Sequence, residues 1–352
     1  MKVLVALSGG VDSSVAAAEL LAAGHDVVGI TMRLWGGESD TGCCSIADVD
    51  DARRVAQQLG IDHLVFNFTD DFDQHVVQPY VDAHRVGLTP NPCIECNRHL
   101  KFHRLAERAD LLGFDAVATG HHATIVQRDG LYFVGRGHDP AKDQSYVVHM
   151  LTQRDLARTM FPIGTMTKAQ VRDRAAALGL RTAAKPDSQD VCFITHAGGR
   201  GEFLGKRLAF HSGRVLDTAG EQVGEVESVE MVTLGQRRGL HLPGGGPKQY
   251  VVDIDHAART VVVGDETLLQ VPTTGVRDVT WVHDDAAVAA VAGGVRVQSS
   301  AHGVTHAARV RATEDGAWQV QWDAAQRRVA PGQTVVFYDP TDAMVLGGGI
   351  AT

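Results

Sequence analysis

The first part of the chain is predicted to fold as an α/β domain with a parallel sheet, and the rest as mostly β structure. Up to about residue 190, short apolar runs alternate with helix-like stretches. This alternation is typical of βαβ units, in which helices cover both faces of a parallel sheet. After about residue 210, helix signals nearly vanish and short apolar runs recur between turn residues, as in small all-β domains or barrels. The 352 residues leave room for two or three domains of roughly 150 residues each.

Each predicted element of the first part has a local reason. Short apolar runs predict strands. Stretches rich in Ala, Leu and charged residues that run up to a glycine predict helices, since glycine readily adopts the left-handed conformation that ends a helix. In chain order we predict strand 3–7, helix 13–23, strand 27–33, helix 50–59, strand 63–68, helix 99–112 and strand 116–119, with Gly24, Gly60 and Gly113 after the helices.

The remaining elements carry turn and cap signals. Asp129-Gly130 between two alternating runs predicts a hairpin over 124–136. Thr167-Lys168-Ala169-Gln170 has the spacing of a capping box and predicts a helix that ends at Gly179. Further strands are predicted at 250–254, 260–263, 295–298, 307–310, 318–322 and 334–338, and the glycine-rich stretch 243–247 predicts a loop.

Composition narrows the class of protein. With 44% hydrophobic and 21% charged residues, the chain is neither a fibre nor a disordered protein. A net charge of -9 disfavours non-specific polyanion binding, yet a local basic patch still acts within a Debye length of about 8 Å. No apolar run approaches the roughly 20 residues that span a bilayer, and the N-terminus lacks the features of a signal peptide. We therefore predict a cytoplasmic protein with no membrane partner.

A phosphate-binding loop is predicted at residues 8–14, Ser8-Gly9-Gly10-Val11-Asp12-Ser13-Ser14. It lies between a predicted strand and a predicted helix, where two glycines let backbone N–H groups and the helix N-terminus point at an anion. Asp12 could hold a magnesium ion that bridges phosphates. The loop lacks the lysine of a Walker motif and the Gly-x-Gly-x-x-Gly of a dinucleotide site. It resembles the loop of the ATP pyrophosphatase superfamily, whose members cleave ATP between the α and β phosphates.

Two of the five cysteines are candidates for chemistry. Cys96 and Cys192 lie in polar, proline-marked sequence that predicts loops, and loop residues are better functional candidates than core residues. Cys96 stands just before a predicted helix that carries Arg98, His99 and Lys101, and both features favour a thiolate. The adjacent pair Cys43-Cys44 has no such surroundings and is predicted to have no chemical role.

A metal site is the alternative for the same cysteines. Cys93 and Cys96 have the spacing of metal ligands, and Cys192 could supply a third thiolate. Zinc would need a fourth ligand, which His99 or His103 could provide, whereas an iron–sulfur cluster can be held by three cysteines with one open iron. The sequence leaves both alternatives open.

Several motifs, in order and over essentially the whole chain, are similar to the tRNA-specific 2-thiouridylase family. They are the phosphate loop, Asn91-Pro92-x-x-x-Cys96-Asn97, Ala118-Thr119-Gly120-His121, Lys142-Asp143-Gln144-Ser145-Tyr146, Asp187-Ser188-Gln189-Asp190-Val191-Cys192-Phe193, Leu234-Gly235-Gln236-Arg237-Arg238-Gly239-Leu240, and Ala330-Pro331-Gly332-Gln333 followed by Val336-Phe337-Tyr338. The resemblance implies an adenine nucleotide alpha hydrolase-like domain over 1–198, a small central domain over 199–272 and a C-terminal β-barrel over 273–352.

The resemblance also implies roles for individual residues. ATP would be held by Ala6, Leu7, Ser8, Gly9, Gly10, Val11, Asp12 and Ser13, with Met32 and Gly120 near the adenosine. Cys192 would carry sulfur as a persulfide, and Cys96 would be the second catalytic thiol. Asn91, Pro92 and Cys93 would meet the target base, and the rest of the tRNA would be met by His121, Lys142, Asp143, Gln144 and Gln333.

The implied reaction is ATP-dependent 2-thiolation of the wobble uridine of tRNA. Adenylation of the uridine 2-oxygen would precede sulfur delivery from a Cys192 persulfide, which a cysteine desulfurase or a sulfur carrier protein loads. A Cys96–Cys192 disulfide would form on one route and a reductant would open it. At position 93 some members carry an acidic residue proposed to assist proton transfer, so Cys93 is a departure that also makes a three-cysteine cluster easier to assemble.

Three alternatives remain at this point. Another adenylating ligase of the superfamily would need neither Cys96 nor Cys192. A cluster-dependent tRNA thiolation enzyme would use Cys93, Cys96 and Cys192 as ligands. A non-catalytic RNA-binding or redox-sensing protein would turn over no ATP.

Overall fold

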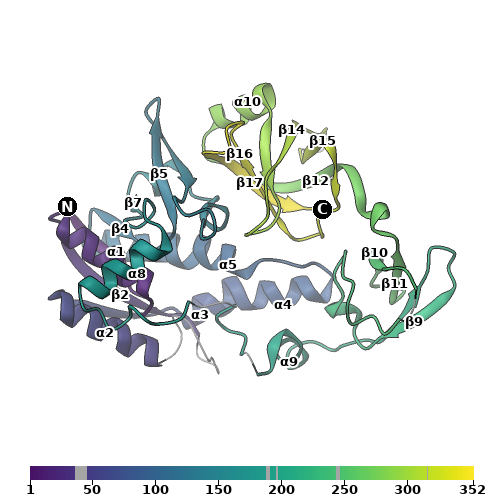
Figure 1. Ribbon diagram of the computed structural model, residues 1–352, viewed down its shortest axis with the longest axis horizontal. Coiled ribbons are helices and arrows are strands. Elements are labelled where there is room, and N and C mark those ends of the chain that lie inside the picture. Colours follow the sequence, from purple (N-terminus) through teal and green to yellow (C-terminus); the bar gives the residue numbers. More distant parts are fainter. Residues whose placement is uncertain (36–45, 188–190, 196, 243–245, 315) are drawn as a thin grey trace.

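The chain folds into an N-terminal α/β domain, a central β domain and a C-terminal barrel (Figure 1). The computed structural model describes residues 1–352 except 36–45, 188–190, 196, 243–245 and 315. The pair Cys43-Cys44, the motif residues Ser188-Gln189-Asp190 and most of the predicted loop 243–247 lie outside the described residues. Among the described residues, no helix combines the length and apolar character that crossing a membrane requires.

The N-terminal domain is built on a five-stranded parallel sheet, as predicted. Its strand order is β3-β2-β1-β4-β7, with bounds β1 (Lys2–Ala6), β2 (Asp26–Arg33), β3 (His63–Asn67), β4 (Ala116–Ala118) and β7 (Thr159–Met160). Alternate β1 residues face opposite sides: Val3 and Val5 pack in one hydrophobic cluster, Leu4 and Ala6 in another. Helices α1 (Val11–Ala22) and α2 (Ile46–Leu59) cover the first face, and α6 (Leu105–Leu111) covers the second.

Two continuous helices differ from the prediction. Residues 69–85, for which we predicted no helix, form α3 (Thr69–Phe72), the π-helical turn η1 (Asp73–Val77) and α4 (Gln78–Arg85). The helix predicted over 99–112 begins earlier and comprises α5 (Pro92–Glu95), the π-helical stretch η2 (Cys96–Arg104) and α6. It starts at Pro92 because the Asn91 side chain accepts a hydrogen bond from the Cys93 N–H at 3.1 Å, and proline suits the first helical position.

The hairpin and the capping box are both confirmed. Strands β5 (Ala123–Arg128) and β6 (Leu131–Arg136) pair antiparallel across Asp129 and Gly130, which have φ angles of 51° and 81°. The helix α8 (Lys168–Ala177) begins with the reciprocal hydrogen bonds of Thr167 and Gln170. The short elements η3 (Ser145–Val148) and α7 (Gln153–Leu156) lie between the hairpin and β7.

The central domain follows α9 (Gly199–Gly205) and contains a four-stranded sheet in the order β10-β11-β8-β9. Its elements are β8 (Gly213–Leu216), β9 (Gln222–Val226), η4 (Val229–Met231), β10 (Tyr250–Asp255) and β11 (Thr260–Gly264). The strands predicted at 250–254 and 260–263 are therefore confirmed, whereas β8 and β9 were not predicted.

The C-terminal barrel is closed, in the order β12-β15-β14-β13-β16-β17. Its bounds are η5 (Glu266–Leu269), β12 (Gln270–Trp281), α10 (Asp284–Gly293), β13 (Val295–Gln298), β14 (His306–Ala312), β15 (Trp318–Arg327), β16 (Thr334–Tyr338) and β17 (Val345–Ala351). The helix α10 and the strands β12 and β17 were not predicted. The predicted domain boundary at 272/273 falls inside β12, and the division into 1–198, 199–272 and 273–352 stays a prediction.

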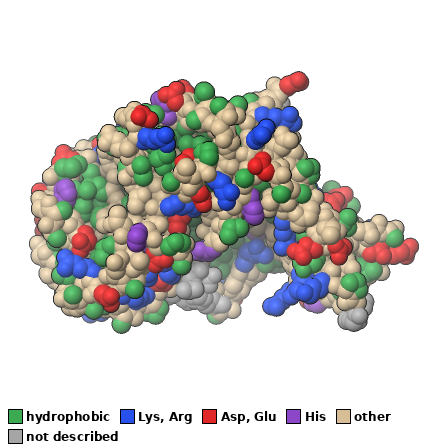
Figure 2. All heavy atoms as spheres, turned by 45° about the horizontal axis from the view of Figure 1, so that its top comes forward, with side chains coloured by type: hydrophobic (Ala, Val, Ile, Leu, Met, Phe, Trp, Pro, Cys, Tyr) green, Lys and Arg blue, Asp and Glu red, His purple; other side chains and the backbone are tan. Residues whose placement is uncertain are grey.

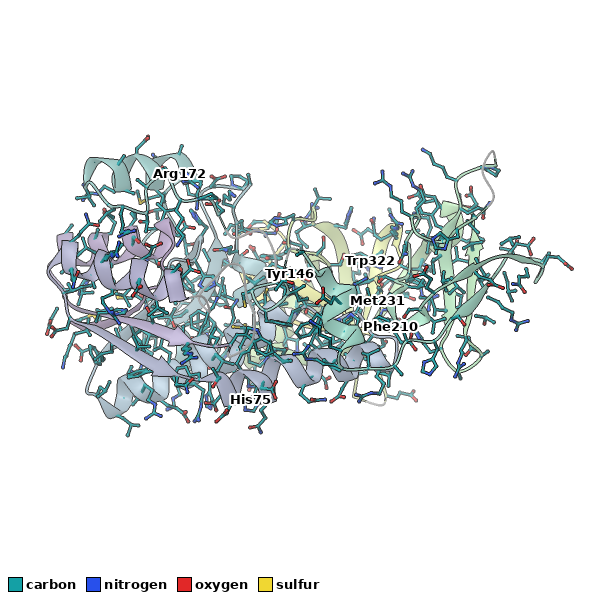
Figure 3. The ribbon with its side chains drawn as sticks, turned by 90° about the horizontal axis from the view of Figure 1, so that it is seen from below. His75, Tyr146, Arg172, Phe210, Met231 and Trp322 are labelled. Atoms are coloured by element: carbon teal, nitrogen blue, oxygen red, sulfur yellow. The ribbon has the colours of Figure 1, made fainter. Side chains whose placement is uncertain are left out.

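The barrel packs directly on the N-terminal domain. The buried Tyr146 hydroxyl, near the middle of the molecule in Figure 3, donates to the Thr334 carbonyl oxygen at 2.9 Å. Ser145 and Tyr338 share a hydrogen bond of 2.9 Å between their hydroxyl groups. Since a single hydrophobic cluster contains residues of η3 and of the barrel strands, the two domains share one core.

Candidate active site

The phosphate loop (residues 8–13) leaves the N-terminus of α1 open to an anion. Gly10 is the N-cap residue and offers no side-chain cap to the first N–H groups of the helix. The loop is held by its own serines: the Ser8 N–H donates to Ser13 Oγ at 3.1 Å, and Ser14 Oγ donates to the Gly10 carbonyl at 2.7 Å. These contacts hold the loop in place and leave the N-terminus of α1 able to bind a phosphate group.

Two glycines let neighbouring segments approach this loop closely. Gly9 has a φ of 74°, and a Cβ there would lie 2.3 Å from the Asp48 carbonyl oxygen of α2. A Cβ on Gly120, just after β4, would lie 2.6 Å from the Ser13 nitrogen. Met32, the other predicted adenosine contact, lies buried near the end of β2. Because β2 and β4 flank β1, both predicted contacts lie at the carboxyl edge of the sheet, where ligands of such sheets bind.

Two side chains to which the sequence analysis gave no functional role, Lys168 and His122, contact Asp12. Lys168 Nζ lies 2.8 and 2.7 Å from the two carboxylate oxygens of Asp12, and His122 Nε2 lies 3.2 Å from Oδ1. Lys168 Nζ also lies 2.8 Å from Asp187 Oδ1, and Asp187 accepts from Lys142 at 2.9 Å and from Arg172 at 2.7 Å. Figure 3 labels Arg172 on α8.

A further lysine, Lys185, joins the phosphate loop to α2. Lys185 Nζ donates to the Gly9 carbonyl at 2.9 Å and pairs with Asp48 and Asp51 of α2. The position of Lys168 could have been noticed in the sequence. It lies in the first turn of a predicted helix, where the helix dipole disfavours a cation unless acidic side chains lie nearby. Asp187 begins one of the motifs that carry the family resemblance, whereas for Lys185 we find no comparable signal.

These contacts keep both acids ionised. Burial alone raises the pKa of Asp12, but the hydrogen bonds from His122 and Lys168 outweigh it and lower that pKa below its usual value. Burial likewise raises the pKa of Asp187, and the hydrogen bonds from Lys168 and Lys142 bring it down to about 2. Asp12 of the phosphate loop and its neighbour Asp187 are therefore both carboxylates, and Lys168 contacts both of them.

The fold brings Cys96 and Cys192 into one hydrophobic cluster. Cys96 is 6% exposed and packs in the cluster that contains Phe72, Phe193 and Phe203, and the half-buried Cys192 packs against the same cluster. The prediction that Cys96 lies in a loop is wrong, because the helix begins at Pro92 and Cys96 is the first residue of η2. π-Helical turns occur often at functional sites.

Two of the cations predicted to surround Cys96, Arg98 and His99, share one acid, Glu95. Glu95 Oε2 lies 3.5 Å from Arg98 Nε and 3.2 Å from His99 Nε2. Arg104 pairs with Asp71 at 2.8 Å. These pairs reduce the positive field of the helix, so the N-terminal turn of the helix remains the clearer local influence on the Cys96 thiol.

The predicted tRNA contacts lie in two places. Lys142 and Gln144 are linked to the phosphate loop through other residues. Gln144 exchanges hydrogen bonds with the main chain of His122 at 2.8 and 2.9 Å, and His122 contacts Asp12. Lys142 contacts Asp187. Gln333 extends from the barrel and donates to the Thr89 carbonyl, just before Asn91. Pro92 is buried and Cys93 is exposed at the start of the helix.

His121 differs from the others because its ring is buried. The ring packs near Phe102 and Phe161, and Nδ1 shares a 2.7 Å hydrogen bond with Thr119 Oγ1. Burial lowers its pKa well below the usual value, so the ring is neutral. Its contact with tRNA stays a prediction, and its neighbour His122 is the histidine that faces Asp12.

The predicted metal cluster gains no support from the geometry. Within the part of the chain that the structure describes, no three His, Cys, Asp or Glu side chains are grouped so that they could hold a metal ion. Cys93 is exposed while Cys96 is buried, so the two side chains of the Cys-x-x-Cys pair meet different surroundings. We derive no step through a cluster.

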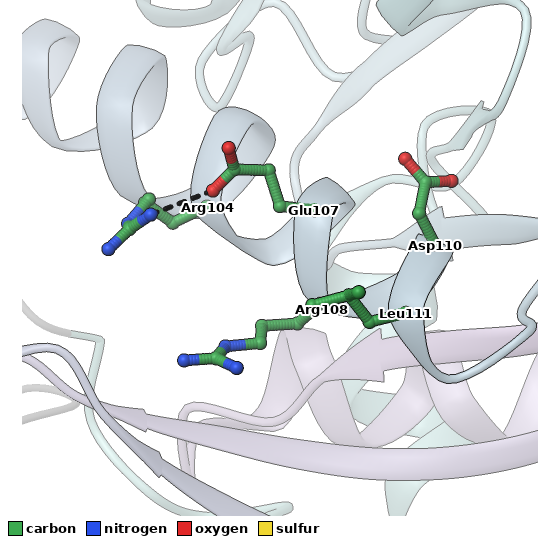
Figure 4. Close-up of a pocket in the computed structure, with 5 residues that line it drawn as sticks. All are labelled: Arg104, Glu107, Arg108, Asp110 and Leu111. Carbon is green, nitrogen blue, oxygen red and sulfur yellow. Dashed lines mark hydrogen bonds and ion pairs between the residues drawn. The ribbon is translucent and has the colours of Figure 1, made fainter.

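A surface hollow elsewhere does not contribute to this site. It measures about 450 Å³ and is lined by residues of one helix, Arg104, Glu107, Arg108, Asp110 and Leu111 (Figure 4). Arg104 and Glu107 are paired across it at 2.9 Å. None of its lining residues belongs to the phosphate loop or to the predicted base-contact segment.

The parallel sheet and the open helix N-terminus after β1 define an ATP pyrophosphatase-type domain joined to two β domains, with two thiols at one hydrophobic cluster. The sequence matches the families described as tRNA methyl transferase HUP domain over residues 1–196, tRNA methyl transferase PRC-barrel domain over 201–265, and aminomethyltransferase beta-barrel domain over 273–351.

Similar proteins match over nearly their full length. The chain is 47% identical to the tRNA-specific 2-thiouridylase MnmA of Chloroflexus aggregans, over 99% of this chain and 97% of the relative. It is 45% identical to the protein of that name from Mycolicibacterium gilvum, over 98% of each. The chain belongs to the tRNA-specific 2-thiouridylase family. Among solved structures, the U34-tRNA thiolase NcsA from Methanococcus maripaludis is 18% identical, with a TM-score of 0.37 over 58% of this chain and 65% of that chain.

Proposed function

We propose that this protein uses ATP to replace the 2-oxygen of the wobble uridine of tRNA with sulfur. The observation that carries the proposal is the combination of an open phosphate loop with two thiols, Cys96 and Cys192, that share one hydrophobic cluster. An adenylating ligase would need the loop but not the thiols. Family membership supports the same reaction.

The first step activates the uridine. The 2-oxygen attacks the α-phosphate of ATP, the bond to the β-phosphate breaks, and pyrophosphate leaves. The N-terminal N–H groups of α1 and the nearby cations Lys168 and Lys185 stabilise the negative charge of the departing pyrophosphate. Residues Ala6 to Ser13 would contact the phosphates, and Met32 and Gly120 the adenosine.

Asp12 has the chemistry to hold the magnesium ion of MgATP. It is ionised, and each of its carboxylate oxygens has more than one lone pair, so its contacts with Lys168 leave acceptor capacity. When bound, the ion would supply Lewis-acid stabilisation of the phosphates.

The second step delivers sulfur from a persulfide on Cys192. The terminal sulfur attacks C2, AMP leaves, and the Cys96 thiolate then attacks Cys192 Sγ to free the thiocarbonyl. Alternatively, Cys96 attacks first and releases hydrosulfide, which attacks C2. Either route ends with a Cys96–Cys192 disulfide that a two-electron thiol reductant must open. A cysteine desulfurase or a sulfur carrier protein would reload Cys192.

The target base must leave the anticodon stack to reach these groups, which costs a few kcal/mol and costs least in an unpaired loop. Asn91, Pro92 and Cys93 would meet the base, and Lys142, Asp143, Gln144, His121 and Gln333 the rest of the tRNA. The exposed Arg237 and Arg238 of the central domain add phosphate contacts. Figure 2 shows basic and acidic side chains interspersed over the face in view, which is consistent with local patches rather than one basic surface.

Nucleoside mass spectrometry tests the proposal. Unmodified tRNA is incubated with the protein, ATP and sulfide, and we expect an oxygen-to-sulfur mass gain confined to the wobble uridine. With a cysteine desulfurase and cysteine as the sulfur source, Cys96→Ser and Cys192→Ser should lose the product. AMP formation with no mass gain in any nucleoside would instead favour an adenylating ligase, and product that requires an anaerobically assembled iron–sulfur cluster would favour the cluster-dependent alternative.

A further inference from the structure

Six residues around the phosphate loop form a ring of contacts that is closed by the main chain of residues 142–144. Lys168 joins Asp12 to Asp187, Asp187 accepts from Lys142, and Gln144 is joined through His122 back to Asp12. The members are Asp12, Lys168, Asp187, Lys142, Gln144 and His122, here called the Asp12 ring. One side of the ring is the ATP loop, and the opposite side is the segment 142–144 predicted to contact tRNA.

Lys168 occupies the key position in this ring. It is the first residue of α8, where the helix dipole disfavours a cation, and the residue is only 9% exposed. Its ammonium group has three protons, and three carboxylate oxygens lie within 2.8 Å of Nζ: both from Asp12 and one from Asp187. A buried lysine in an unfavourable helix position is retained here by two acids from different segments.

The backbone of Lys168 is tied to the same tRNA-side segment. Its N–H donates to Asp139 Oδ2 at 2.9 Å, and the Asp139 carbonyl accepts from the Lys142 N–H at 3.0 Å. The start of α8 is therefore linked to the segment that leads into 142–144 through Asp139 as well as through Asp187.

Three carboxylate oxygens already surround the Lys168 ammonium group, which makes the ring sensitive to phosphate. A phosphate oxygen that accepts from Nζ competes with these oxygens for the three protons of the ammonium group. Asp187 keeps its contacts with Lys142 and Arg172 when it loses Lys168, whereas Asp12 keeps only the one from His122 among the contacts described above. Phosphate binding is thus expected to loosen the Lys168–Asp187 contact.

We propose that Lys168 couples ATP binding at the phosphate loop to tRNA binding at residues 142–144. The inference rests on the proposed function for the identity of the polynucleotide. By linkage, if ATP tightens tRNA binding by some factor, tRNA tightens ATP binding by the same factor. Loss of Lys168 should therefore reduce the coupling factor more than it reduces the binding of either ligand alone.

The test measures the Kd of a non-hydrolysable ATP analogue by calorimetry, with and without saturating tRNA. Coupling of about tenfold is expected in the unaltered protein, in line with allosteric couplings of roughly 5- to 150-fold. Lys168→Met and Asp187→Asn should each reduce it to less than about twofold, and Lys168→Arg should restore part of it. Asp187→Asn keeps the proposal testable if Lys168→Met fails to fold.

Arg174→Met is the matched control. Arg174 lies on the same helix and pairs with Glu19 of α1 at 2.6 Å. The substitution therefore removes an ion pair between α1 and α8 that is not part of the Asp12 ring. It should keep the full coupling factor. Coupling that survives in both Lys168→Met and Asp187→Asn, or that is lost equally in Arg174→Met, would overturn the inference. Absence of coupling in the unaltered protein would also overturn it, while tRNA that binds but gains no sulfur would count against the proposed function alone.

Discussion

Gly9 faces the main-chain carbonyl oxygen of Asp48 so closely that a Cβ on Gly9 would lie 2.3 Å from that oxygen. The contact joins the phosphate loop to α2, and the same Gly9 accepts from Lys185 through its own carbonyl. Gly9 also has a φ of 74°, a conformation that side chains with a Cβ rarely adopt. Its position in the loop is therefore fixed from two sides by residues far along the chain.

Gly9→Ala is accordingly expected to weaken ATP binding. Either the loop or the first part of α2 must move to relieve the contact, which would misalign the N–H groups at the start of α1. We expect the affinity for a non-hydrolysable ATP analogue to fall by at least about tenfold, which is 1.4 kcal/mol, as measured by calorimetry. Gly24→Ala is the control, because Gly24 has a φ of 78° with nothing within 4 Å of a Cβ. Equal affinities in the two variants would contradict the prediction.

A second glycine, Gly332, sets the contact between the barrel and the segment before Asn91. It has a φ of 91°, and a Cβ there would lie 2.9 Å from both the Thr89 nitrogen and Leu88 Cβ. The flanking Pro331 carbonyl accepts from the Thr89 N–H at 2.9 Å, and Gln333 donates to the Thr89 carbonyl. Gly332→Ala should push the barrel away from this segment and break both hydrogen bonds, each worth about 1 kcal/mol.

The expected result is a fall of about tenfold or more in tRNA thiolation at low tRNA concentration, with ATP analogue binding unchanged. Thiolation and thermal unfolding are measured for Gly332→Ala beside Gly220→Ala. Gly220 has a φ of 86° with open space around it, so that variant has the same backbone strain without the contact. If the two variants thiolate tRNA equally well, the barrel contact does not position the segment.

Local sequence patterns predicted the elements around the phosphate loop because each depends on neighbouring residues. The β1 strand, the loop and α1 follow one another in the chain, and the Thr167 capping box spans a single turn. Local patterns did not predict elements whose conformation depends on tertiary packing. The strand β17 was not predicted, and it contains glycine where the barrel packs closely, since a Cβ on Gly348 would lie 2.5 Å from the His149 ring. Helix α10 was also not predicted, and it lies in a part of the chain whose other predicted elements are all strands.

Much of the candidate site depends on contacts between distant positions. Lys168 and Asp12 are 156 residues apart, so no window of sequence shows that they pair. The candidates Cys96 and Cys192 were chosen from their surroundings and from family resemblance, and only the fold places them against one hydrophobic cluster. The burial of His121 and the pairing of Arg98 with Glu95 likewise follow from tertiary packing that residue type does not predict.

His149 is expected to make stability depend on pH. Burial between the N-terminal domain and the barrel lowers its pKa from 6.5 to about 4. Between these values the unfolded chain binds a proton and the folded protein does not, so stability falls as the pH drops from 6.5 toward 4. The full difference corresponds to on the order of 3 kcal/mol. His149→Gln removes this proton site and can still donate to the Tyr146 carbonyl, which His149 Nδ1 contacts at 2.9 Å.

Thermal unfolding at about pH 7.5 and about pH 5 measures the effect. The fall in Tm between the two pH values should be smaller in His149→Gln than in the unaltered protein, by about 3 °C or more. His103→Gln serves as the control, because it replaces a histidine in the same way at a side chain that is 66% exposed. A His149→Gln protein with the same loss of Tm would show that other groups cause it.

Cys93 distinguishes the persulfide route from a three-cysteine cluster. It is exposed at the start of the helix, while Cys96 and Cys192 lie at one hydrophobic cluster. On the persulfide route, Cys93→Ser should keep thiolation within about threefold, a change of less than 1 kcal/mol, while Cys96→Ser and Cys192→Ser lose it. On the cluster route all three substitutions remove a ligand and should abolish thiolation alike.

The measurement is 2-thiouridine formed per enzyme with a cysteine desulfurase and cysteine, for the three serine variants and for Cys93→Asp. The aspartate variant supplies a carboxyl group that can donate or accept a proton at this position. If proton transfer at the base depends on position 93, Cys93→Asp should thiolate faster than Cys93→Ser, and the difference should grow at low pH, where a neutral carboxyl can donate. Equal rates at every pH would assign proton transfer to another group, and loss of product in Cys93→Ser together with loss of visible absorbance would support a cluster.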